Sequence, residues 1–263
     1  MPVNKIDAME SSAVAGPVWL VLPTYNEAEN IEDFVAAARA ALPADGRVLI
    51  VDDNSPDGTG EIADRIAAAS ERAVEVLHRP RKEGLGVAYI DGFRRVLAGE
   101  ASLICQMDSD FSHDPADLPR LIAAAADADL VIGSRYVKGG GVTEWGLVRR
   151  AISRGGSIYA RMVLGLRLRD LTGGFKCWRR AALEAVELDT VPAHGYAFQI
   201  ETTYRVVEAG FSVREVPILF RDRQAGSSKM TRRIVFEAAW RVPLLRLGRR
   251  RERGALQVQT PRS

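Results

Sequence analysis

Short apolar runs alternate with alanine-rich stretches through the first half of this chain, and that alternation restricts the fold more than any other feature. The apolar runs are mostly continuous, which is typical of strands covered on both faces. They occupy residues 18–22, 48–51, 74–77, 103–107 and 130–132. The stretches between them carry apolar residues at helical spacing, at 28–42, 59–69, 86–97 and 116–126. The pattern predicts an α/β fold with a mostly parallel central sheet and helices on both faces.

The second half follows a different pattern and ends in a basic segment. Residues 149–166 are predicted to form an amphipathic helix, and residues 211–220 return to strand character. Residues 232–253 hold eight arginines against two glutamates, beside several large apolar residues. We therefore expect one folded domain over residues 17–231, an amphipathic basic segment over 232–253 and a disordered tail over 254–263.

Composition argues against several classes of protein. The chain has 263 residues and is 47% hydrophobic, enough for a substantial core. Its net charge of +2 creates no global field, so we expect no nucleic-acid partner. Two cysteines make no disulfide framework and fit a reducing cytosol, and the three histidines lie too far apart for a zinc site. We expect neither a secretory signal nor a membrane-spanning helix.

Residues 107–115 read Met-Asp-Ser-Asp-Phe-Ser-His-Asp-Pro and begin at the end of an apolar run. Two carboxylates one residue apart, just past a buried strand, make an oxygen-rich corner. Asp108 and Asp110 can both turn toward one hard divalent cation, and such a cation commonly bridges a diphosphate. The alternative is an aspartate-rich turn, because aspartate favours turns through local hydrogen bonds.

Polar residues also follow the first two predicted strands, at the edge where an open α/β sheet binds ligands. Tyr25 can lie against a nucleobase and Glu27 can accept from a base or ribose, although a capped turn explains both equally well. Asp53 can accept from a base N–H, but a simple Asp/Asn turn is favoured there. A basic loop at residues 79–86 contains Lys82, and it either lies beside a diphosphate or is solvated. That loop matches neither the dinucleotide-binding nor the P-loop glycine pattern.

Five motifs occur along the chain in a fixed order: Pro-Thr-Tyr-Asn-Glu, Val-Asp-Asp-Asn-Ser-Pro-Asp-Gly-Thr, Gly-Leu-Gly-x-Ala-Tyr, Met-Asp-Ser-Asp-Phe-Ser-His-Asp-Pro and Gly-Ser-Arg-Tyr. Together they resemble the inverting family 2 glycosyltransferases, and more narrowly the dolichol-phosphate (polyprenol-phosphate) mannose synthases. The similarity covers residues 18–231. It implies that residues 17–231 form a catalytic domain of the GT-A, or nucleotide-diphospho-sugar transferase, fold.

The resemblance also implies roles for individual residues. Asp108 and Asp110 would serve a Mg²⁺ or Mn²⁺ cofactor, and Ser112, where some relatives have glutamine, would add an oxygen contact directly or through water. The candidates for donor binding are Pro23, Tyr25, Glu27, Asp53, Lys82, Asp108, Arg223 and Lys229. The candidates for the acceptor phosphate are Arg135, Arg149 and Ser153. The candidates for catalysis are Asp108, Asp110 and Arg135. Arginine forks phosphate oxygens well, although each arginine taken alone is more often a surface ion pair.

The absence of a candidate general base near residues 171–176 favours a phosphate acceptor over a hydroxyl acceptor. Many family 2 enzymes that use hydroxyl acceptors carry an acid near the position of the segment 171–176, which reads Leu-Thr-Gly-Gly-Phe-Lys here. A phosphate monoester has a second pKa of about 6, so it is already anionic and needs no strong base. The expected reaction is a single in-line displacement at the sugar C1 with inversion. The Thr-Gly-Gly-Phe-Lys loop either shapes the sugar pocket or is only a turn.

We therefore expect transfer of mannose from GDP-mannose to a polyprenyl phosphate. UDP-glucose is the alternative donor; an inactive membrane scaffold and a nucleotidyltransferase are alternatives from other classes. The lipid acceptor implies a peripheral position on the cytoplasmic face of the membrane. Residues 234–253 combine apolar and basic side chains that suit an interfacial helix, although a core-packed helix is the alternative. Residues 152–166 are a second lipid-facing candidate, and a membrane-embedded partner protein is another route to the lipid.

Overall fold

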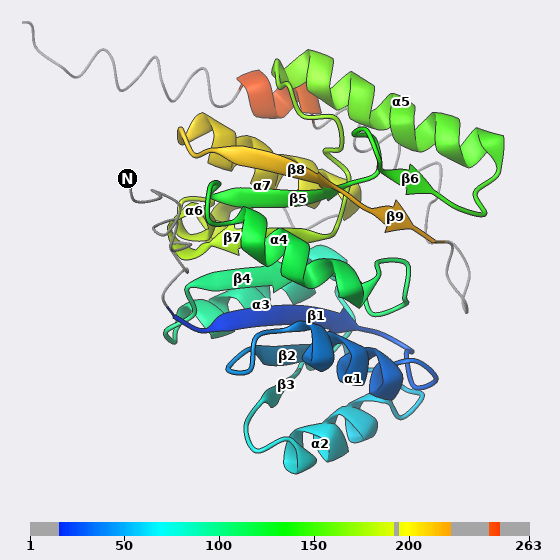
Figure 1. Ribbon diagram of the computed structural model, residues 1–263, viewed down its shortest axis with the longest axis vertical. Helices are drawn as coiled ribbons and strands as arrows, with labels where there is room; N and C mark the ends of the chain where they lie inside the picture. Colours follow the sequence, from blue (N-terminus) through cyan, green and yellow to red (C-terminus); the bar gives the residue numbers. More distant parts are fainter. Residues whose placement is uncertain (1–15, 192–194, 222–241, 248–263) are drawn as a thin grey trace, which may run out of the picture.

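The apolar runs of the first half form parallel strands, and the computed structural model, which describes residues 16–191, 195–221 and 242–247, confirms the α/β fold (Figure 1). Within these residues a seven-stranded sheet has the order β3-β2-β1-β4-β7-β5-β8, and β6 pairs with β9. The strands are β1 (Val18–Thr24), β2 (Arg47–Asp52), β3 (Val74–His78), β4 (Leu103–Gln106), β5 (Leu130–Ser134), β6 (Gly141–Val142), β7 (Lys176–Arg179), β8 (Val213–Pro217) and β9 (Leu219–Phe220). The α-helices are α1 (Ile31–Ala41), α2 (Thr59–Ala69), α3 (Leu85–Leu97), α4 (Leu118–Ala124), α5 (Leu147–Leu164), α6 (Arg180–Glu184) and α7 (Gly195–Glu208).

Both faces of the sheet are covered, which explains why the strands are continuously apolar. In β1, Leu20 and Leu22 belong to a core shared with α1, α2 and α4, the helices in front in Figure 1. Trp19 and Val21 belong to a second core, shared with α3, α6 and α7 behind the sheet. Because successive side chains of a strand point to opposite faces, every position of β1 is buried on one side or the other.

β7 departs from the predicted pattern. It pairs antiparallel with both β4 and β5, whereas the other pairs of the seven-stranded sheet are parallel. The sequence did not predict this strand, because Lys176 interrupts its apolar run. The side chain of Lys176 is nevertheless fully buried. Because β7 is antiparallel to β4 and β5, the loop that precedes β7 lies at the edge of the sheet where β4 and β5 end.

A third apolar cluster joins α5 to α7. Ala160 and Leu164 of α5 pack with Ile200 of α7 and with Val242, which begins the helical segment 242–247. The described part of the predicted basic segment thus packs on the domain, while its remainder and the predicted tail lie outside the described residues. No helix in the described part of the chain combines the length and apolar character that a membrane crossing requires.

Two predicted helices begin later than their sequences indicate. α1 begins at Ile31 instead of residue 28, because the preceding residues turn through Asn26, whose φ is 58°. A 3-10 turn at Pro115–Asp117 precedes α4, and the Asp114 side chain accepts from a backbone N–H there. Asp114 and Pro115 thus begin a 3-10 turn, and the α-helix follows it.

Gly92 sets how closely α3 approaches the sheet. A Cβ at this position would lie 2.5 Å from Cγ1 of Val21 and 3.0 Å from Cγ2 of Val51. We predict that Gly92→Ala forces the helix and the sheet apart and lowers the free energy of unfolding by about 1–3 kcal/mol. Urea denaturation followed by circular dichroism measures this change.

Gly156→Ala is the matched control in α5. A Cβ at Gly156 would meet nothing within 4 Å, so the change restricts the unfolded chain without crowding the fold. It should raise the free energy of unfolding by up to about 1 kcal/mol. Unchanged stability of the Gly92→Ala protein would show that the helix does not depend on this close approach.

Candidate functional site

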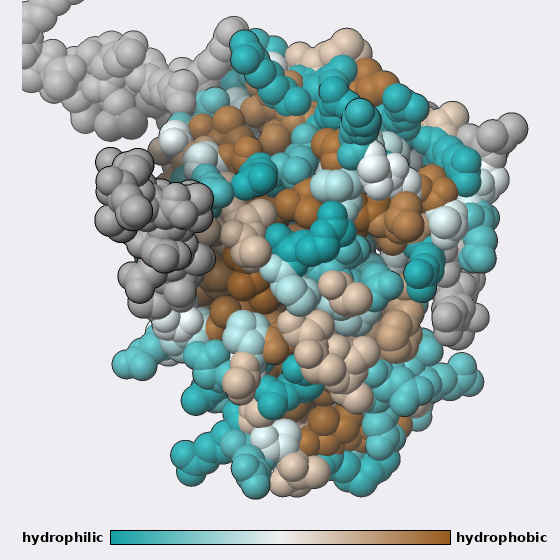
Figure 2. Space-filling view, in the orientation of Figure 1, coloured by the Kyte–Doolittle hydropathy of each residue, from teal (hydrophilic) through white to brown (hydrophobic). Residues whose placement is uncertain are grey.

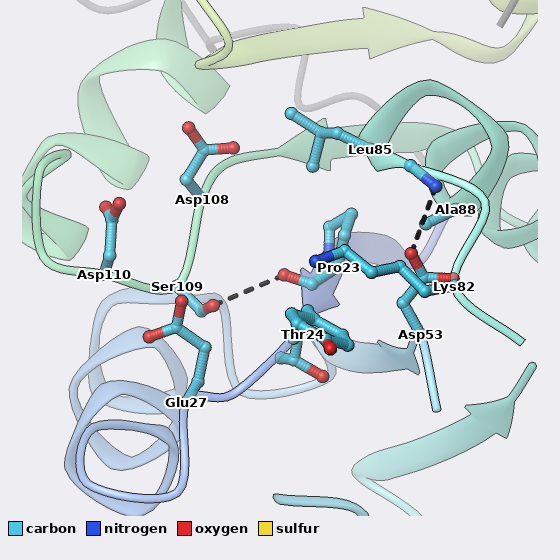
Figure 3. A pocket seen from close by; sticks show the side chains of 12 residues that line it. Pro23, Thr24, Glu27, Asp53, Lys82, Leu85, Ala88, Asp108, Ser109 and Asp110 are labelled. Carbon is cyan, nitrogen blue, oxygen red and sulfur yellow. Dashed lines mark hydrogen bonds between the residues drawn. The ribbon is translucent and has the colours of Figure 1, made fainter. Parts of the chain in front are cut away.

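The carboxyl ends of β1, β2 and β4 meet at a pocket of about 140 Å³ (Figure 3). Adjacent parallel strands deliver their loops to one edge of the sheet, so residues far apart in sequence share it. Its lining residues are Pro23, Thr24, Tyr25, Glu27, Asp53, Lys82, Gly84, Leu85, Ala88, Asp108, Ser109 and Asp110. Every predicted donor contact within the described residues is among them. Arg223 and Lys229 lie outside the described residues.

Hydrogen bonds lock the loop after β1 to the loop after β2. The backbone N–H of Glu27 donates to Oγ1 of Thr59 (2.9 Å), and that of Ala28 donates to Oδ2 of Asp57 (3.1 Å). Burial acts to raise the pKa of Asp57, but the hydrogen bonds from Thr59 and Ala28 hold it below its usual value. The Asp/Asn turn after β2 therefore does exist, and it holds Glu27 at the pocket.

Asp53 is buried and organises the basic loop after β3. The Arg79 guanidinium forms an ion pair with its carboxylate, and two backbone N–H groups of the loop donate to it at 3.4 and 3.3 Å. The loop is thereby folded over the pocket. It brings Nζ of Lys82 to 3.3 Å from the centroid of the Tyr25 ring. A direct bond from Asp53 to a base stays a prediction, because the described contacts show Asp53 holding the loop.

The acidic corner, which we define as Asp108, Asp110 and Ser112, follows β4 directly. The hydroxyl of Tyr89 donates to Oδ1 of Asp108 (3.3 Å). Ser109 lies between the two aspartates, and its hydroxyl donates to the carbonyl of Pro23 (3.3 Å), as Figure 3 shows. This bond ties the loop after β4 to β1, with both carboxylates lining the pocket.

The residues of the acidic corner fit a hard divalent cation. The backbone N–H of Ser112 donates to Oδ1 of Asp110 (3.0 Å), while its buried hydroxyl has no hydrogen-bond partner among the described residues. A cation beside the two carboxylates would satisfy that hydroxyl. No group of three His, Cys, Asp or Glu side chains suited to a metal occurs in the described part of the chain. Ser112, water and ligand oxygens would complete the coordination, which is the all-oxygen set that Mg²⁺ and Mn²⁺ favour.

Two buried side chains that lie within the sequence motifs, but to which the sequence assigned no role, adjoin this corner. Burial raises the pKa of Tyr89 well above its usual value, and the charge of Asp108 adds to the effect. Tyr89 is therefore a neutral donor. Burial also lowers the pKa of His113, against the opposing charges of the acidic corner. The His113 ring packs between Phe175 and Phe220, with centroids 5.4 and 5.1 Å away.

Arg135 follows β5 and forms a buried two-point ion pair with Asp170. Nε and one terminal nitrogen of Arg135 each donate to a carboxylate oxygen at 2.7 Å, and its backbone N–H donates at 3.0 Å. The same terminal nitrogen donates to Oγ1 of Thr172 (2.8 Å). Burial acts to raise the pKa of Asp170, but the guanidinium holds it below its usual value. The predicted phosphate ligand Arg135 is thus fixed in orientation by Asp170, an acid to which the sequence analysis assigned no role.

α5 gathers the other predicted acceptor residues beside Arg135. The Arg149 guanidinium lies 4.2 Å from the centroid of a Trp145 ring, and the Arg135 guanidinium lies 5.8 Å from one. Ser153 is buried, and its hydroxyl accepts from the hydroxyl of Tyr136 (2.7 Å). The structure therefore brings Arg135, Arg149 and Ser153 to one side of the domain, and their contact with a phosphate stays a prediction.

Lys176, the first residue of β7, is fully buried. Its Nζ donates to the carbonyl of Gln199 (2.8 Å) and to Oγ1 of Thr203 (2.9 Å), which anchors β7 to α7. Burial lowers the pKa of Lys176 to about 7, although the charge of Asp170 opposes the shift. The sequence pattern did not predict that this lysine is buried, since its burial depends on α7 covering the sheet.

Comparison of sequences identifies relatives of the whole domain. Residues 19–187 match glycosyl transferase family 2. The chain is 47% identical over 221 residues to the undecaprenyl-phosphate mannosyltransferase of Micrococcus luteus, which covers 84% of this chain and 90% of that protein. It is 45% identical over 224 residues to the polyprenol monophosphomannose synthase of Mycolicibacterium smegmatis. This alignment covers 85% of this chain and 84% of that protein.

Solved structures share the fold. Glucosyl-3-phosphoglycerate synthase from Mycobacterium tuberculosis, in complex with Mg²⁺ and uridine diphosphate, matches with a TM-score of 0.65 at 20% identity, over 94% of this chain and 85% of that one. The complex of the same enzyme with Mn²⁺, uridine diphosphate and glucosyl-3-phosphoglycerate matches with a TM-score of 0.63 at 19% identity. This match covers 95% of this chain and 85% of that one. At this identity the likeness establishes the fold alone.

Lys176 should make stability rise with pH. In the folded protein it releases its proton near pH 7, whereas its ordinary pKa is 10.5. Between these values the unfolded chain binds more protons, so the free energy of unfolding increases with pH, by up to about 1.4 kcal/mol per pH unit. We predict that Lys176→Met removes this contribution, as measured by urea denaturation at pH 7, 8 and 9.

Lys138→Met is the control, because Lys138 is exposed. It should leave the dependence of stability on pH unchanged. A Lys176→Met protein with the wild-type slope over this range would mean that the buried ammonium keeps its proton.

Proposed function

This chain belongs to glycosyl transferase family 2, and we propose that it moves mannose from GDP-mannose to a polyprenyl monophosphate, giving polyprenyl-phosphate mannose and GDP. Two relatives over most of its length bear names for mannosyl transfer to such lipids or for their synthesis. The observation that carries the proposal is the acidic corner at the edge of the pocket between the loops after β1, β2 and β4. Mg²⁺ or Mn²⁺ held by Asp108 and Asp110 would attract a diphosphate to that position and neutralise its charge, because hard cations favour oxygen ligands.

Each residue around the pocket has a separate task in this proposal. Asp108, Asp110 and Ser112 would hold Mg²⁺ or Mn²⁺, which when bound neutralises charge on the leaving diphosphate. Tyr89 fixes the Asp108 carboxylate through its hydrogen bond. Lys82 places a positive charge at the pocket mouth, where it attracts the same diphosphate.

The proposed reaction is one displacement. An oxygen of the acceptor phosphate forms a bond to C1 of mannose as the bond from C1 to the diphosphate oxygen breaks, and that electron pair leaves with GDP. Attack from the face opposite the leaving group inverts C1. Arg149 and Ser153 hold the acceptor phosphate in line, with Arg135 beside them.

Asp170 is a positioning residue and not a base in this scheme. Its carboxylate is buried, its oxygens accept from Arg135, and the guanidinium lowers its pKa. Such a group is a poor proton acceptor at neutral pH. A phosphate acceptor needs none, because its second pKa of about 6 leaves it anionic. The buried ion pair is therefore compatible with a phosphate acceptor.

The outer face of α5 suits a lipid surface. Val148, Ile152 and Met162 are exposed by 73%, 43% and 65%, and Arg150 and Arg154 of the same helix are also exposed. Figure 2 shows apolar and hydrophilic side chains side by side in this region. Apolar groups that enter the headgroup layer and arginines that pair with anionic lipids favour peripheral binding. Because Arg149 and Ser153 lie on the same helix, α5 would bring the lipid phosphate to its site.

Asp110→Asn tests the acidic corner, because it keeps the side chain's shape and removes one negative charge. We predict a loss of mannosyl transfer of at least about a hundredfold, with thermal unfolding unchanged. The assay follows labelled mannose from GDP-mannose with Mn²⁺ into extractable polyprenyl phosphate, with UDP-glucose run alongside. Asp114→Asn is the matched control, since asparagine preserves the helix cap. Efficient labelling from UDP-glucose alone would overturn the proposed donor.

Arg149→Ala tests the acceptor site. Loss of a charge-assisted hydrogen bond should raise the KM for polyprenyl phosphate about tenfold to a hundredfold, and leave the KM for GDP-mannose within about twofold. Arg167→Ala, at an exposed position just beyond the end of the same helix, serves as the control. Steady-state kinetics with a short-chain acceptor in detergent separates the two constants. Equal effects on donor and acceptor would contradict this division of the site.

A further inference from the structure

A side-chain amide near the acidic corner carries a donor that no described residue accepts. Gln199 lies on α7 and is only 3% exposed. Its Oε1 accepts from Nε2 of Gln106 (3.1 Å), but its own Nε2 has no hydrogen-bond partner among the described residues. A buried donor without a partner is costly, and native structures seldom keep one unless a ligand or water meets it.

The orientation of this amide follows from Trp178. An indole N–H can only donate, and that of Trp178 donates to Oε1 of Gln106 (2.9 Å). The Nε2 of Gln106 must therefore face the other way, where it donates to the carbonyl of Gly174 (3.0 Å) and to Oε1 of Gln199. Because Oε1 of Gln199 is the end that meets Gln106, its Nε2 is the end left to face a ligand.

The backbone around Gln199 is fixed as well. Its carbonyl accepts from Nζ of Lys176 (2.8 Å) and from Oγ1 of Thr203 (2.9 Å). Both ends of the residue are thus held, the main chain by β7 and the side chain by Gln106. A donor held in this way loses little freedom when it meets a partner, which is the condition for selective binding.

Gly174 places this donor beside Asp108. A Cβ built on Gly174 would lie 3.7 Å from Nε2 of Gln199 and 3.7 Å from each carboxylate oxygen of Asp108. One point, which the glycine keeps clear of any side chain, is therefore close to both an amide donor and a carboxylate acceptor. Gly174 belongs to the loop before β7, for which the sequence left a sugar pocket and a plain turn as alternatives.

We propose that Gln199 and Asp108 together hold one hydroxyl of the mannose in the donor. A hydroxyl accepts from the amide N–H and donates to the carboxylate, so it satisfies both groups at once. A phosphate oxygen has no proton to give and is repelled by Asp108, and a cation cannot accept from the amide. The inference rests on the proposed function, because a diphosphate at the acidic corner sets its sugar beside Asp108. Gln106 acts as a positioning residue.

Gln199→Met removes the donor and keeps the length of the side chain. Titration calorimetry with Mn²⁺ should show GDP-mannose bound about tenfold more weakly, while GDP, which lacks the sugar, binds as it does to the wild type. Thr202→Val is the matched control on α7, because among the described residues the Thr202 hydroxyl donates only to carbonyls of its own helix. It should leave both affinities unchanged.

Gly174→Ala provides a test that leaves α7 untouched. The added methyl group would sit 3.7 Å from its nearest neighbours, an ordinary contact, so the protein without ligand should fold normally. The same methyl would occupy space that the sugar needs. The variant should therefore also bind GDP-mannose about tenfold more weakly, while its affinity for GDP stays unchanged.

Monodeoxy analogues of GDP-mannose identify the hydroxyl. One analogue should bind the wild type about tenfold more weakly than GDP-mannose does. Its affinity for the Gln199→Met protein should be no lower than for the wild type, because the hydrogen bond that the substitution removes is already absent. Equal weakening of GDP and GDP-mannose in Gln199→Met, or no weakening of either, would overturn the inference while wild-type transfer leaves the proposed function standing. Failure of the wild type to transfer mannose to polyprenyl phosphate would instead refute the proposed function.

Discussion

The buried ion pair between Arg135 and Asp170 is the interaction on which the second half of the site depends. Removing two charges from water costs several kcal/mol per ion, and only good geometry with further hydrogen bonds offsets that cost. Here Asp170 also accepts from the backbone N–H of Arg135, and Arg135 also donates to Thr172. Since Arg135 follows β5 and Asp170 opens the loop into β7, the pair fixes two segments against each other. The ion pair therefore helps to position the loop that contains Gly174, together with the hydrogen bond from Gln106 to the Gly174 carbonyl.

The reversed direction of β7 lets this loop take part in the site. Parallel strands place their exits at one edge of a sheet and their entrances at the other. β7 enters at the edge where β4 and β5 leave, because it is antiparallel to both. Gly174 therefore lies against Asp108, between the pocket built by β1, β2 and β4 and the arginines carried by β5 and α5. A parallel strand in this place would have delivered its entrance loop to the opposite edge.

The sequence was sufficient to place a candidate residue at the pocket wherever that residue follows the end of a strand within a few positions. Pro23, Asp53 and Asp108 could be assigned to one edge because each comes just after an apolar run, and the structure brings them into one pocket. Contacts between distant segments could not be predicted in this way. Tyr89 meets Asp108 from 19 residues away, and Gln106 meets Gln199 from 93. β7 was missed for a related reason, since the burial of Lys176 depends on partners that α7 supplies only after folding.

Unsatisfied polar atoms concentrate at this site. Among the described residues, Oγ1 of Thr24, Oγ of Ser112 and Nε2 of Gln199 are buried without hydrogen-bond partners, and Thr24 lines the pocket. Each such group costs about 1–3 kcal/mol, and most buried polar groups in native proteins are paired. The proposed sugar nucleotide and its metal would bring hydroxyls, phosphate oxygens and positive charge to these atoms, so their binding would relieve existing penalties as well as add contacts. A ligand that lacked the matching hydroxyl would leave Gln199 unsatisfied, and a site built on buried polar groups therefore discriminates between sugars more strongly than an apolar pocket does.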